Sequence, residues 1–352
     1  MSSHPPLGLI EGFFGPPWPE AERLAFAPFL QQNDFQFYIY APKAQPFLRK
    51  RWQEPWPADF TATLKNLSQH FRSHKVQFGV GLSPFELHKL DPAKGKQELQ
   101  SKLRQLDEIG LDVLGLFFDD MPVHEGMAAA QLEAIETVRQ ATKAKIIFCP
   151  AFYTPDPILE KVFGRRPEKY WDEIKAAPKE IDFAWTGPKV ISEEIPLEHL
   201  YETADLLGRR PFLWDNLYAN DGPRNCKFLK IRPPISRTRP ALEACSGWAW
   251  NPMNQAALSR LVMLGARHSV LDRTAPSFAL EQAMQESCPP SLANFVSRHR
   301  QEMLEKGLDK IEPEKKEEWS RALKEWADHP VAREIDDWLA EKYVVGNECL
   351  TD

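Results

Sequence analysis

Eight short apolar segments alternate with amphipathic segments from residue 7 to residue 252. Several of the apolar segments are almost continuous, which is typical of strands buried on both faces of a parallel sheet. The amphipathic segments carry apolar residues at helical spacing. The strand-like segments are LGLIEG (7–12), FQFYIYAP (35–42), VQFGVGLSP (76–84), VLGLFFDD (113–120), KIIFCPAFY (145–153), DFAWTG (182–187), PFLWDN (211–216) and SGWAWNP (246–252).

This alternation predicts an α/β protein with the architecture of a (β/α)8 TIM barrel. A doubly wound open sheet is the alternative. Such a sheet usually has a glycine-rich phosphate loop after its first strand. The segment EGFFGPPW (11–18) contains glycines but lacks the GxGxxG pattern, so the barrel is favoured. Within the segment that follows the first strand, Pro28 is expected to kink or divide the helix.

The sequence pattern changes after residue 274, where strand-like segments stop and short helical segments are separated by prolines. We therefore expect a barrel domain over residues 1–274 and a C-terminal α-helical appendage over residues 275–352. Three tryptophans of the appendage lie among charged residues, and we expect them to pack on the barrel. The alternative is a dimerisation surface, which would make the protein a homodimer through these helices. These residues are Trp319, Trp326 and Trp338.

The charge and apolar content exclude several classes of partner. The net charge is −6 and no long basic run occurs, so neither nucleic acid nor an anionic membrane is an expected partner. No apolar run approaches the ~20 residues that span a bilayer. The N-terminal residues show no signal-peptide pattern, and we expect a cytoplasmic protein. The odd number of cysteines and the absence of a CxxC pair predict free thiols, at Cys149, Cys226, Cys245, Cys288 and Cys349.

Polar and aromatic residues stand at the end of nearly every predicted strand. In a TIM barrel the chemistry takes place at the C-terminal ends of the strands. These residues therefore predict a functional site on one rim of the barrel. They include Glu11, Gly12, Lys43, Asp119, Asp120, Tyr153, Trp185, Thr186, Trp214, Asp215, Asn216, Asn220, Asp221, Trp250 and Asn251.

Two adjacent carboxylates, Asp119 and Asp120, end the fourth predicted strand. Neighbouring residues of a regular strand face opposite sides, so both enter one site only if the strand end kinks. Repulsion between them would then raise the pKa of one. One carboxylate and one carboxylic acid at neutral pH suit acid and base work on a glycosidic bond. The alternative is a helix N-cap or an Asx-turn.

The aromatic content points to a sugar ligand. The chain has 11 tryptophans, and Trp185, Trp214 and Trp250 lie at predicted strand ends. Flat apolar faces pack on the C–H surfaces of pyranose rings, while amide, carboxylate and ammonium groups bond hydroxyls. The alternative is that these tryptophans fill the core.

Seven motifs at these strands resemble glycoside hydrolase family 84, the family of O-GlcNAcases and bacterial β-N-acetylglucosaminidases, also described as hyaluronidase-like. The resemblance covers about residues 7–253 and does not extend to the C-terminal quarter. WTGPKV and WDNLYAND are the most specific of the motifs. In chain order they are GLIEGFFGPPW, YIYAPK, FFDD, FCPAFY, WTGPKVISEEIP, WDNLYAND and WNPM.

The resemblance implies a retaining exo-β-N-acetylglucosaminidase that cleaves terminal β-linked GlcNAc. In this family the acetamido oxygen of the substrate attacks the anomeric carbon and forms an oxazoline, an exception to the two-carboxylate scheme. By position, Asp119 would orient the acetamido N–H and Asp120 would be the general acid and then the general base. This chemistry needs no cofactor and no metal. The segment VHEG after the aspartates also lacks the HExxH spacing of a zinc site.

The resemblance also assigns substrate contacts outside the aspartate pair. By position they are the Gly12 backbone and Lys43 at sugar hydroxyls, Asn216 beside the acetamido group, Asp221 at the distal hydroxyls, Asn251 at a further sugar position, and Tyr153 and Trp214 at the walls of the acetyl pocket.

Three positions depart from the usual pattern of the family. Ala44 and Gln45 replace two carboxylates after the second strand, and Phe152 replaces an acid after the fifth. These changes leave the preferred β-GlcNAc-bearing substrate open, either an O-GlcNAc glycoprotein or a glycan or cell-wall fragment. A catalytically silent GlcNAc-binding protein is the non-enzyme alternative, which the intact aspartate pair disfavours.

Overall fold

A computed structural model of the chain describes residues 4–351. Eight parallel strands close into a barrel in the order in which they occur in the chain. This confirms the (β/α)8 architecture. The strands are β1 (Leu7–Glu11), β2 (Phe37–Tyr40), β3 (Gln77–Leu82), β4 (Val113–Phe117), β5 (Lys145–Cys149), β6 (Asp182–Trp185), β7 (Phe212–Asp215) and β8 (Gly247–Trp250).

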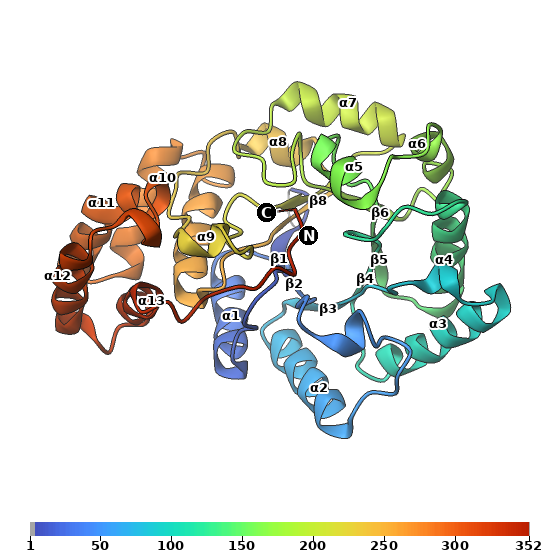
Figure 1. Ribbon diagram of the computed structural model, residues 1–352, viewed down its shortest axis with the longest axis horizontal. Coiled ribbons are helices and arrows are strands. Elements are labelled where there is room, and N and C mark those ends of the chain that lie inside the picture. Colours follow the sequence, from blue (N-terminus) through green and yellow to red (C-terminus); the bar gives the residue numbers. More distant parts are fainter. Residues whose placement is uncertain (1–3, 352) are drawn as a thin grey trace.

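Helices surround the barrel on its outside (Figure 1). The helices between α1 and α9 connect successive strands and close the circuit after β8. They are α1 (Glu20–Gln32), α2 (Ala58–Ser73), α3 (Pro92–Asp107), α4 (Met127–Ala141), α5 (Pro157–Phe163), α6 (Tyr170–Ile174), α7 (Leu197–Leu207), α8 (Arg239–Glu243) and α9 (Ala256–Val270). Short 3₁₀ turns are η1 (Pro46–Leu48), η2 (Leu87–Lys89), η3 (Asn225–Lys227), η4 (Leu308–Lys310) and η5 (Lys324–Trp326).

The strands are shorter than the apolar segments that predicted them. The fourth segment was expected to run to Asp120, but β4 ends at Phe117. The same holds for the other strands, whose last predicted residues lie in the loops at the C-terminal rim. Polar residues at the strand ends therefore sit on loops that can turn inward, which is where TIM barrels carry their chemistry.

The prediction that Pro28 divides the first helix was wrong, because α1 is one helix with Pro28 inside it. Proline has no N–H, so the carbonyl of Leu24, four residues earlier, loses its helical donor. His70 of α2 replaces that donor, with its Nε2 atom 3.1 Å from the Leu24 carbonyl oxygen. A side chain from a neighbouring helix thus satisfies the carbonyl group that the proline leaves free.

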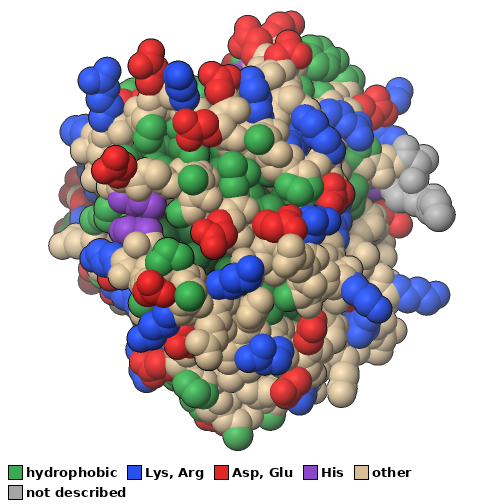
Figure 2. Space-filling view, turned by 90° about the vertical axis from the view of Figure 1, so that its right-hand side faces the viewer, with side chains coloured by type: hydrophobic (Ala, Val, Ile, Leu, Met, Phe, Trp, Pro, Cys, Tyr) green, Lys and Arg blue, Asp and Glu red, His purple; other side chains and the backbone are tan. Residues whose placement is uncertain are grey.

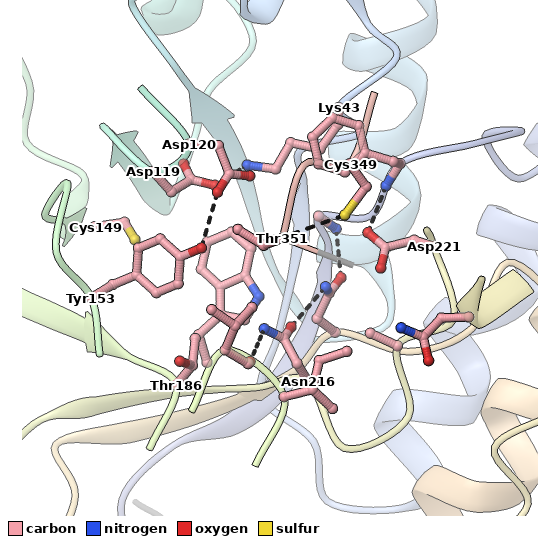
Figure 3. A pocket seen from close by; sticks show the side chains of 18 residues that line it. Lys43, Asp119, Asp120, Cys149, Tyr153, Thr186, Asn216, Asp221, Cys349 and Thr351 are labelled. Carbon is pink, nitrogen blue, oxygen red and sulfur yellow. Dashed lines mark hydrogen bonds and ion pairs between the residues drawn. The ribbon is translucent and has the colours of Figure 1, made fainter. Parts of the chain in front are cut away.

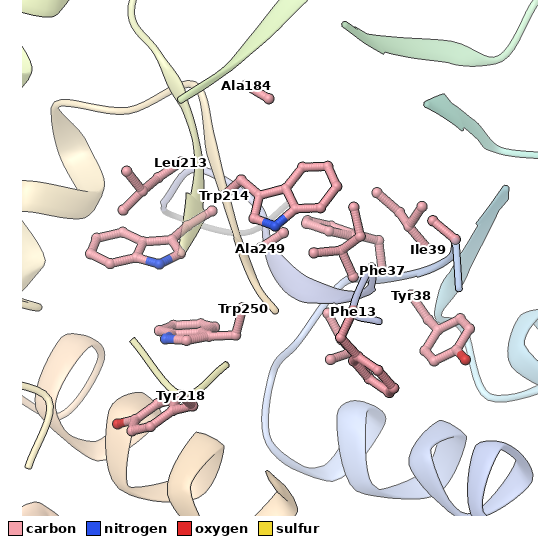
Figure 4. Close-up of a cluster of buried hydrophobic side chains, with 14 of the residues drawn as sticks. Phe13, Phe37, Tyr38, Ile39, Ala184, Leu213, Trp214, Tyr218, Ala249 and Trp250 are labelled. Carbon is pink, nitrogen blue, oxygen red and sulfur yellow. The ribbon is translucent and has the colours of Figure 1, made fainter. Parts of the chain in front are cut away.

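The barrel interior and the layer beneath the helices form one large apolar core (Figure 4). Trp250 is fully buried and stacks on Trp248 with ring centroids 5.5 Å apart. Trp185 is also buried, and its Nε1 donates to His199 Nε2 at 3.0 Å. Among the three tryptophans considered for sugar stacking, these two are core residues. Only Trp214 reaches the pocket described below.

Four helices follow the barrel, as expected for the C-terminal segment. Each begins with a proline at its first position, where the missing N–H costs nothing. Trp338 is buried against the barrel side and donates to the Cys226 carbonyl at 3.2 Å, while Trp319 is buried beside Phe295 and His299 of α11. Trp326 stays half-buried. The helices are α10 (Pro276–Ser287), α11 (Pro290–Glu305), α12 (Pro313–Leu323) and α13 (Pro330–Leu339).

The helix α13 is bonded directly to the barrel. The buried carboxylate of Glu334 accepts the backbone N–H groups of Ala257 and Leu258, both at 2.8 Å, at the start of α9. A carboxylate is favourable at a helix N-terminus because the first N–H groups have no helical acceptor. Beyond α13 the chain turns back and runs across the barrel mouth (Figure 1). The sequence analysis did not predict that return.

The surface and the cysteines agree with the composition. On the face shown in Figure 2, acidic and basic side chains are interspersed rather than separated into single-sign patches. All five cysteines are free thiols, as predicted. Within residues 4–351, none of the helices has the length and apolar character needed to cross a bilayer.

A buried ion pair fixes the end of β7. Arg237 donates from Nε and Nη2 to the two carboxylate oxygens of Asp215, at 3.0 and 2.9 Å, and both side chains are almost completely buried. Asp215 also accepts Trp248 Nε1 at 3.2 Å. The loop that follows carries Asn216 into the pocket described below.

Arg237→Met is expected to lower the free energy of unfolding by ~3–5 kcal/mol, because Asp215 would stay buried without its cation. Denaturant unfolding measures the change. Lys342→Met is the control, since Lys342 pairs with Asp337 on the exposed surface and exposed pairs contribute little. Equal stability losses in the two variants would contradict the structural role of the buried pair.

Candidate active site

A pocket opens at the C-terminal ends of the barrel strands, and all nine residues assigned from the sequence line it (Figure 3). They come from the ends of six strands or the loops that follow them. The structure therefore brings together residues up to 239 positions apart in the chain. The nine residues are Gly12, Lys43, Asp119, Asp120, Tyr153, Trp214, Asn216, Asp221 and Asn251.

The two aspartates both face the pocket because the backbone kinks after β4. Asp120 has a φ of 56°, in the left-handed region that residues other than glycine rarely adopt. This is the departure from regular strand geometry that the sequence required. The helix N-cap alternative was wrong, since α4 starts at Met127 after Gly126. Unfavourable backbone geometry of this kind is concentrated at functional sites.

Asp119 is held in its ionised form by two cations. It forms an ion pair with Lys43, and Arg49 lies close enough to add its charge. Burial alone would raise the pKa of Asp119, but these two cations outweigh it and keep the pKa below its usual value. The second oxygen, Oδ1, is buried and has no hydrogen-bond partner among the described residues. It is a hydrogen-bond acceptor for which the described residues supply no donor.

Asp120 is shifted in the opposite direction. Burial raises its pKa, and the negative charge of Asp119 adds to that rise. The hydroxyl of Tyr153 donates to Asp120 Oδ1 at 3.0 Å, and Arg49 Nη2 donates to the Asp120 carbonyl at 3.1 Å. When the pKa values of two neighbouring carboxyl groups are moved apart in this way, one group can act as a base and the other as an acid at the same pH.

A chain of amide hydrogen bonds forms the opposite wall. The backbone N–H of Gly12 donates to Asn251 Oδ1 at 3.1 Å, and Asn251 Nδ2 donates to Asn216 Oδ1 at 2.9 Å. Asn216 Nδ2 in turn donates to the Val190 carbonyl at 2.8 Å. These bonds fix which way each amide points and so fix which polar atoms remain for a ligand.

Gly12 and Trp214 approach each other so closely that a side chain at position 12 would not fit. A Cβ atom there would lie 2.5 Å from Trp214 Cζ2. The Nζ atom of Lys43 lies 5.5 Å from the centroid of the same indole ring, which is within cation–π distance. Trp214 is thereby held between the first strand and the Lys43–Asp119 ion pair.

Asp221 lies at the far side of the pocket and links two loops. Its Oδ2 atom accepts the backbone N–H of Phe14 at 2.9 Å. Burial raises the pKa of Asp221 to about 6, although the hydrogen bond from Phe14 opposes that rise. Asp221 is half-buried, and its place in the pocket lining favours a binding role over that of a plain turn residue.

Residues around the aspartates and in the pocket lining include several that the sequence did not indicate. Arg49 carries no motif, since its contact with the aspartates depends on how the loop after β2 folds. Cys149 was interpreted only as a free thiol, although its place at the end of β5 was a usable signal. Cys349 and Thr351 come from the C-terminal segment, which no pattern connected to the barrel. The pocket lining not foreseen includes Cys149, Val190, Ile191, Ala219, Asn225, Cys349 and Thr351.

The three departures from the family pattern have local structural roles. Gln45 accepts the Phe47 N–H at 3.3 Å and so caps the turn η1. Phe152 is buried against Tyr170, with ring centroids 5.3 Å apart. Ala44 lines a neighbouring groove. No group of three or more His, Cys, Asp or Glu side chains arranged to hold a metal ion occurs within residues 4–351.

Comparisons with known proteins agree on the family. A model of the family described as NAGidase, beta-N-acetylglucosaminidase, matches residues 7–305. Protein O-GlcNAcase of Rattus norvegicus and that of Mus musculus are each 29% identical to this chain over 258 residues, which is 70% of this chain. The chain spans only 28% of the length of these relatives.

A solved structure extends the likeness beyond the barrel. An O-GlcNAc hydrolase mutant of Thermobaculum terrenum superposes with a TM-score of 0.76 and 28% sequence identity. The match covers 90% of this chain and 70% of that one.

Lys43→Met is expected to raise the pKa of Asp119, because the nearer of the two cations that hold it ionised is removed. Carboxyl-carbon NMR titration of the aspartates measures the change. Lys50→Met is the matched control, since Lys50 is an exposed lysine on the same loop. An unchanged Asp119 titration in Lys43→Met would contradict the account of the pair.

Proposed function

The chain belongs to the β-N-acetylglucosaminidase family of glycoside hydrolases, and we propose that its pocket removes terminal β-linked GlcNAc from a glycoconjugate with retention of configuration. One observation carries the proposal. Two adjacent aspartates, Asp119 buried and Asp120 half-buried, have pKa values displaced in opposite directions, and Asp119 has a buried oxygen without a partner among the described residues.

Asp119 provides the carboxylate that substrate-assisted catalysis requires. Its unpartnered Oδ1 atom accepts the N–H of the substrate's acetamido group. That bond places the acetamido oxygen against the anomeric carbon and increases its electron density. The oxygen then forms a bond to the anomeric carbon while the glycosidic C–O bond breaks, which gives an oxazoline. The substrate supplies the nucleophile, so no enzyme carboxylate needs to attack.

Asp120 provides the proton. Burial and the charge of Asp119 raise its pKa, which favours the protonated form that donates to the glycosidic oxygen as that bond breaks. The resulting carboxylate takes a proton from water as the water attacks the anomeric carbon and opens the oxazoline. The Tyr153 hydroxyl, which donates to Asp120 Oδ1, holds the carboxyl group in place through both steps.

The remaining pocket residues hold the sugar. The Gly12 backbone, Lys43 and Asn251 bond hydroxyl groups, and Asp221 bonds the distal hydroxyls. Asn216 lies beside the acetamido group, whose methyl group packs between Tyr153 and Trp214. The amide chain through Asn251 and Asn216 supports this assignment because it leaves these side chains only a few orientations.

The aglycone lies outside this pocket. A groove of about 570 Å³ adjoins it and shares Phe14, Lys43 and Asp120 with its lining. A space of that size supports a bulky aglycone, either O-GlcNAc protein or a glycan. A cytoplasmic location and a homodimer through the C-terminal helices stay predictions from the sequence.

Replacing Asp120 should have an effect that depends on the leaving group. Asp120→Asn is expected to lower kcat/KM by ~10²–10⁴-fold on a methylumbelliferyl β-GlcNAc, because general acid catalysis is lost. The dinitrophenyl glycoside needs little protonation and should lose much less. An equal loss on both substrates would remove Asp120 from the acid role.

Asp119→Asn is the matched variant. Oxazoline formation itself is impaired there, so both glycosides should lose activity to a similar extent. A strong leaving-group dependence in Asp119→Asn would mean that the two roles are reversed. Inactivity of the unmodified protein on both glycosides would favour the silent GlcNAc-binding alternative.

A further inference from the structure

The segment Val344–Thr351 returns from the C-terminal helices to the open end of the barrel (Figure 1). Two of its side chains, Cys349 and Thr351, line the same pocket as the aspartate pair and Asp221 (Figure 3). The thiol of Cys349 lies 3.8 Å from Thr351 Oγ1. A segment of sequence outside the recognised motifs is therefore part of the pocket wall.

One residue of the segment, Val345, packs closely on the barrel. Val345 is 3% exposed and packs with Phe14 and Cys226, with Cys349 at the edge of this cluster. A Cβ atom on Gly15 would lie only 2.7 Å from Val345 Cγ2, so the valine fits closely over the loop after β1. Within residues 4–351, no backbone hydrogen bond joins residues 344–351 to the barrel or to a helix.

The side chains of the segment separate into those that face the barrel and those that do not. Val344 and Leu350 are 61% and 59% exposed, in contrast to Val345. Asn347, Glu348 and Leu350 line the groove next to the pocket. The segment therefore lies along the boundary between the sugar pocket and the groove, where the bond between sugar and aglycone would be.

Little space remains beneath the segment. The volume open to the centres of water molecules in the pocket is about 50 Å³, which is room for about four waters at ~10–15 Å³ each. A GlcNAc residue has more non-hydrogen atoms than four waters and needs more room than they do. The side chains at the strand ends cannot move far to enlarge the pocket, because Trp214, Tyr153 and Asn216 are buried and either packed or hydrogen-bonded. The segment, whose residues 346–348 and 350 are exposed, is the part that can move.

We propose that residues 344–351 form a displaceable cover that occupies the pocket and must withdraw before a GlcNAc residue can enter. The proposal rests on the proposed function for the identity of the sugar. The cover and the sugar compete for one space, so the apparent affinity for substrate is reduced by the fraction of molecules in which the cover is open. Weakening the Val345 anchor increases that fraction.

The chain offers a matched pair of variants. Val345→Asp places a charge in the buried anchor, whereas Val344→Asp places the same charge on the exposed neighbour. If the open form is ~10% populated or less, Val345→Asp should raise kcat/KM for an aryl β-GlcNAc by about tenfold or more, chiefly through KM. Val344→Asp should leave kcat/KM unchanged. If both variants and the unmodified protein have equal kcat/KM, the proposal of a displaceable cover is wrong.

Cys349 gives a readout that does not depend on activity. Burial, together with the charges of Asp221 and Asp120, raises the pKa of the Cys349 thiol, so alkylation in the closed form is slow. Peptide mapping after iodoacetamide treatment should show faster labelling of Cys349 in Val345→Asp than in Val344→Asp. A thiazoline analogue of the oxazoline should speed labelling in the unmodified protein, because the bound ring displaces the cover.

The two proposals fail separately. If Cys349 is labelled at the same rate in both variants, or is protected by the thiazoline, the segment is a fixed wall and the cover is wrong. If labelling differs as expected but none of the three proteins hydrolyses the glycoside, the cover stands as a conformational device and the proposed function is contradicted.

Discussion

The ion pair between Lys43 and Asp119 determines what the pocket can do. Without a cation beside it, burial and a neighbouring carboxylate would both raise the pKa of Asp119, as they do for Asp120. Lys43, helped by Arg49, keeps Asp119 ionised, and the charge of Asp119 then adds to the burial that raises the pKa of Asp120. Adjacent residues of the same type thereby acquire different roles, which is the physical basis of the proposed chemistry.

The barrel makes this arrangement stable. Closure in sequence order brings the ends of all eight strands to one rim. Lys43 and Asp119 therefore meet although 76 positions separate them in the chain. The left-handed backbone conformation of Asp120 is unfavourable by itself. Two hydrogen bonds stabilise it, one from Tyr153 to the Asp120 side chain and one from Arg49 to the Asp120 carbonyl. Gly12 lets the first strand approach Trp214 closely enough to support the other side.

Local patterns in the sequence predicted most of the barrel and the set of residues around the pocket. Apolar runs and the polar residues that end them are properties of neighbouring residues, so they can be recognised without a structure. The predicted strands were too long because the hydrogen-bond pairing that ends a strand is not visible in the sequence, and the first loop residues, such as Phe118, stay as buried as the strands. Pro28 was misjudged because its effect is offset by His70 from another helix, which sequence spacing does not reveal.

The contributions of Arg49 and of residues 344–351 could not be predicted for a related reason. Each depends on the path of a loop or segment that has no repeating pattern and meets the site only in the folded chain. Trp185 and Trp250 were considered for sugar stacking but are core residues. A position at a strand end does not say whether a side chain points to the pocket or to the core. Only the packing decides that, as it does for Trp214.

The most direct measurement of the central claim is hydrolysis of an aryl β-N-acetylglucosaminide with and without a thiazoline mimic of the oxazoline. The account predicts turnover with retained anomeric configuration and competitive inhibition by the mimic, because the aspartate pair is built around a nucleophile that the substrate carries. Turnover that inverts the configuration, or that the mimic fails to inhibit, would contradict it.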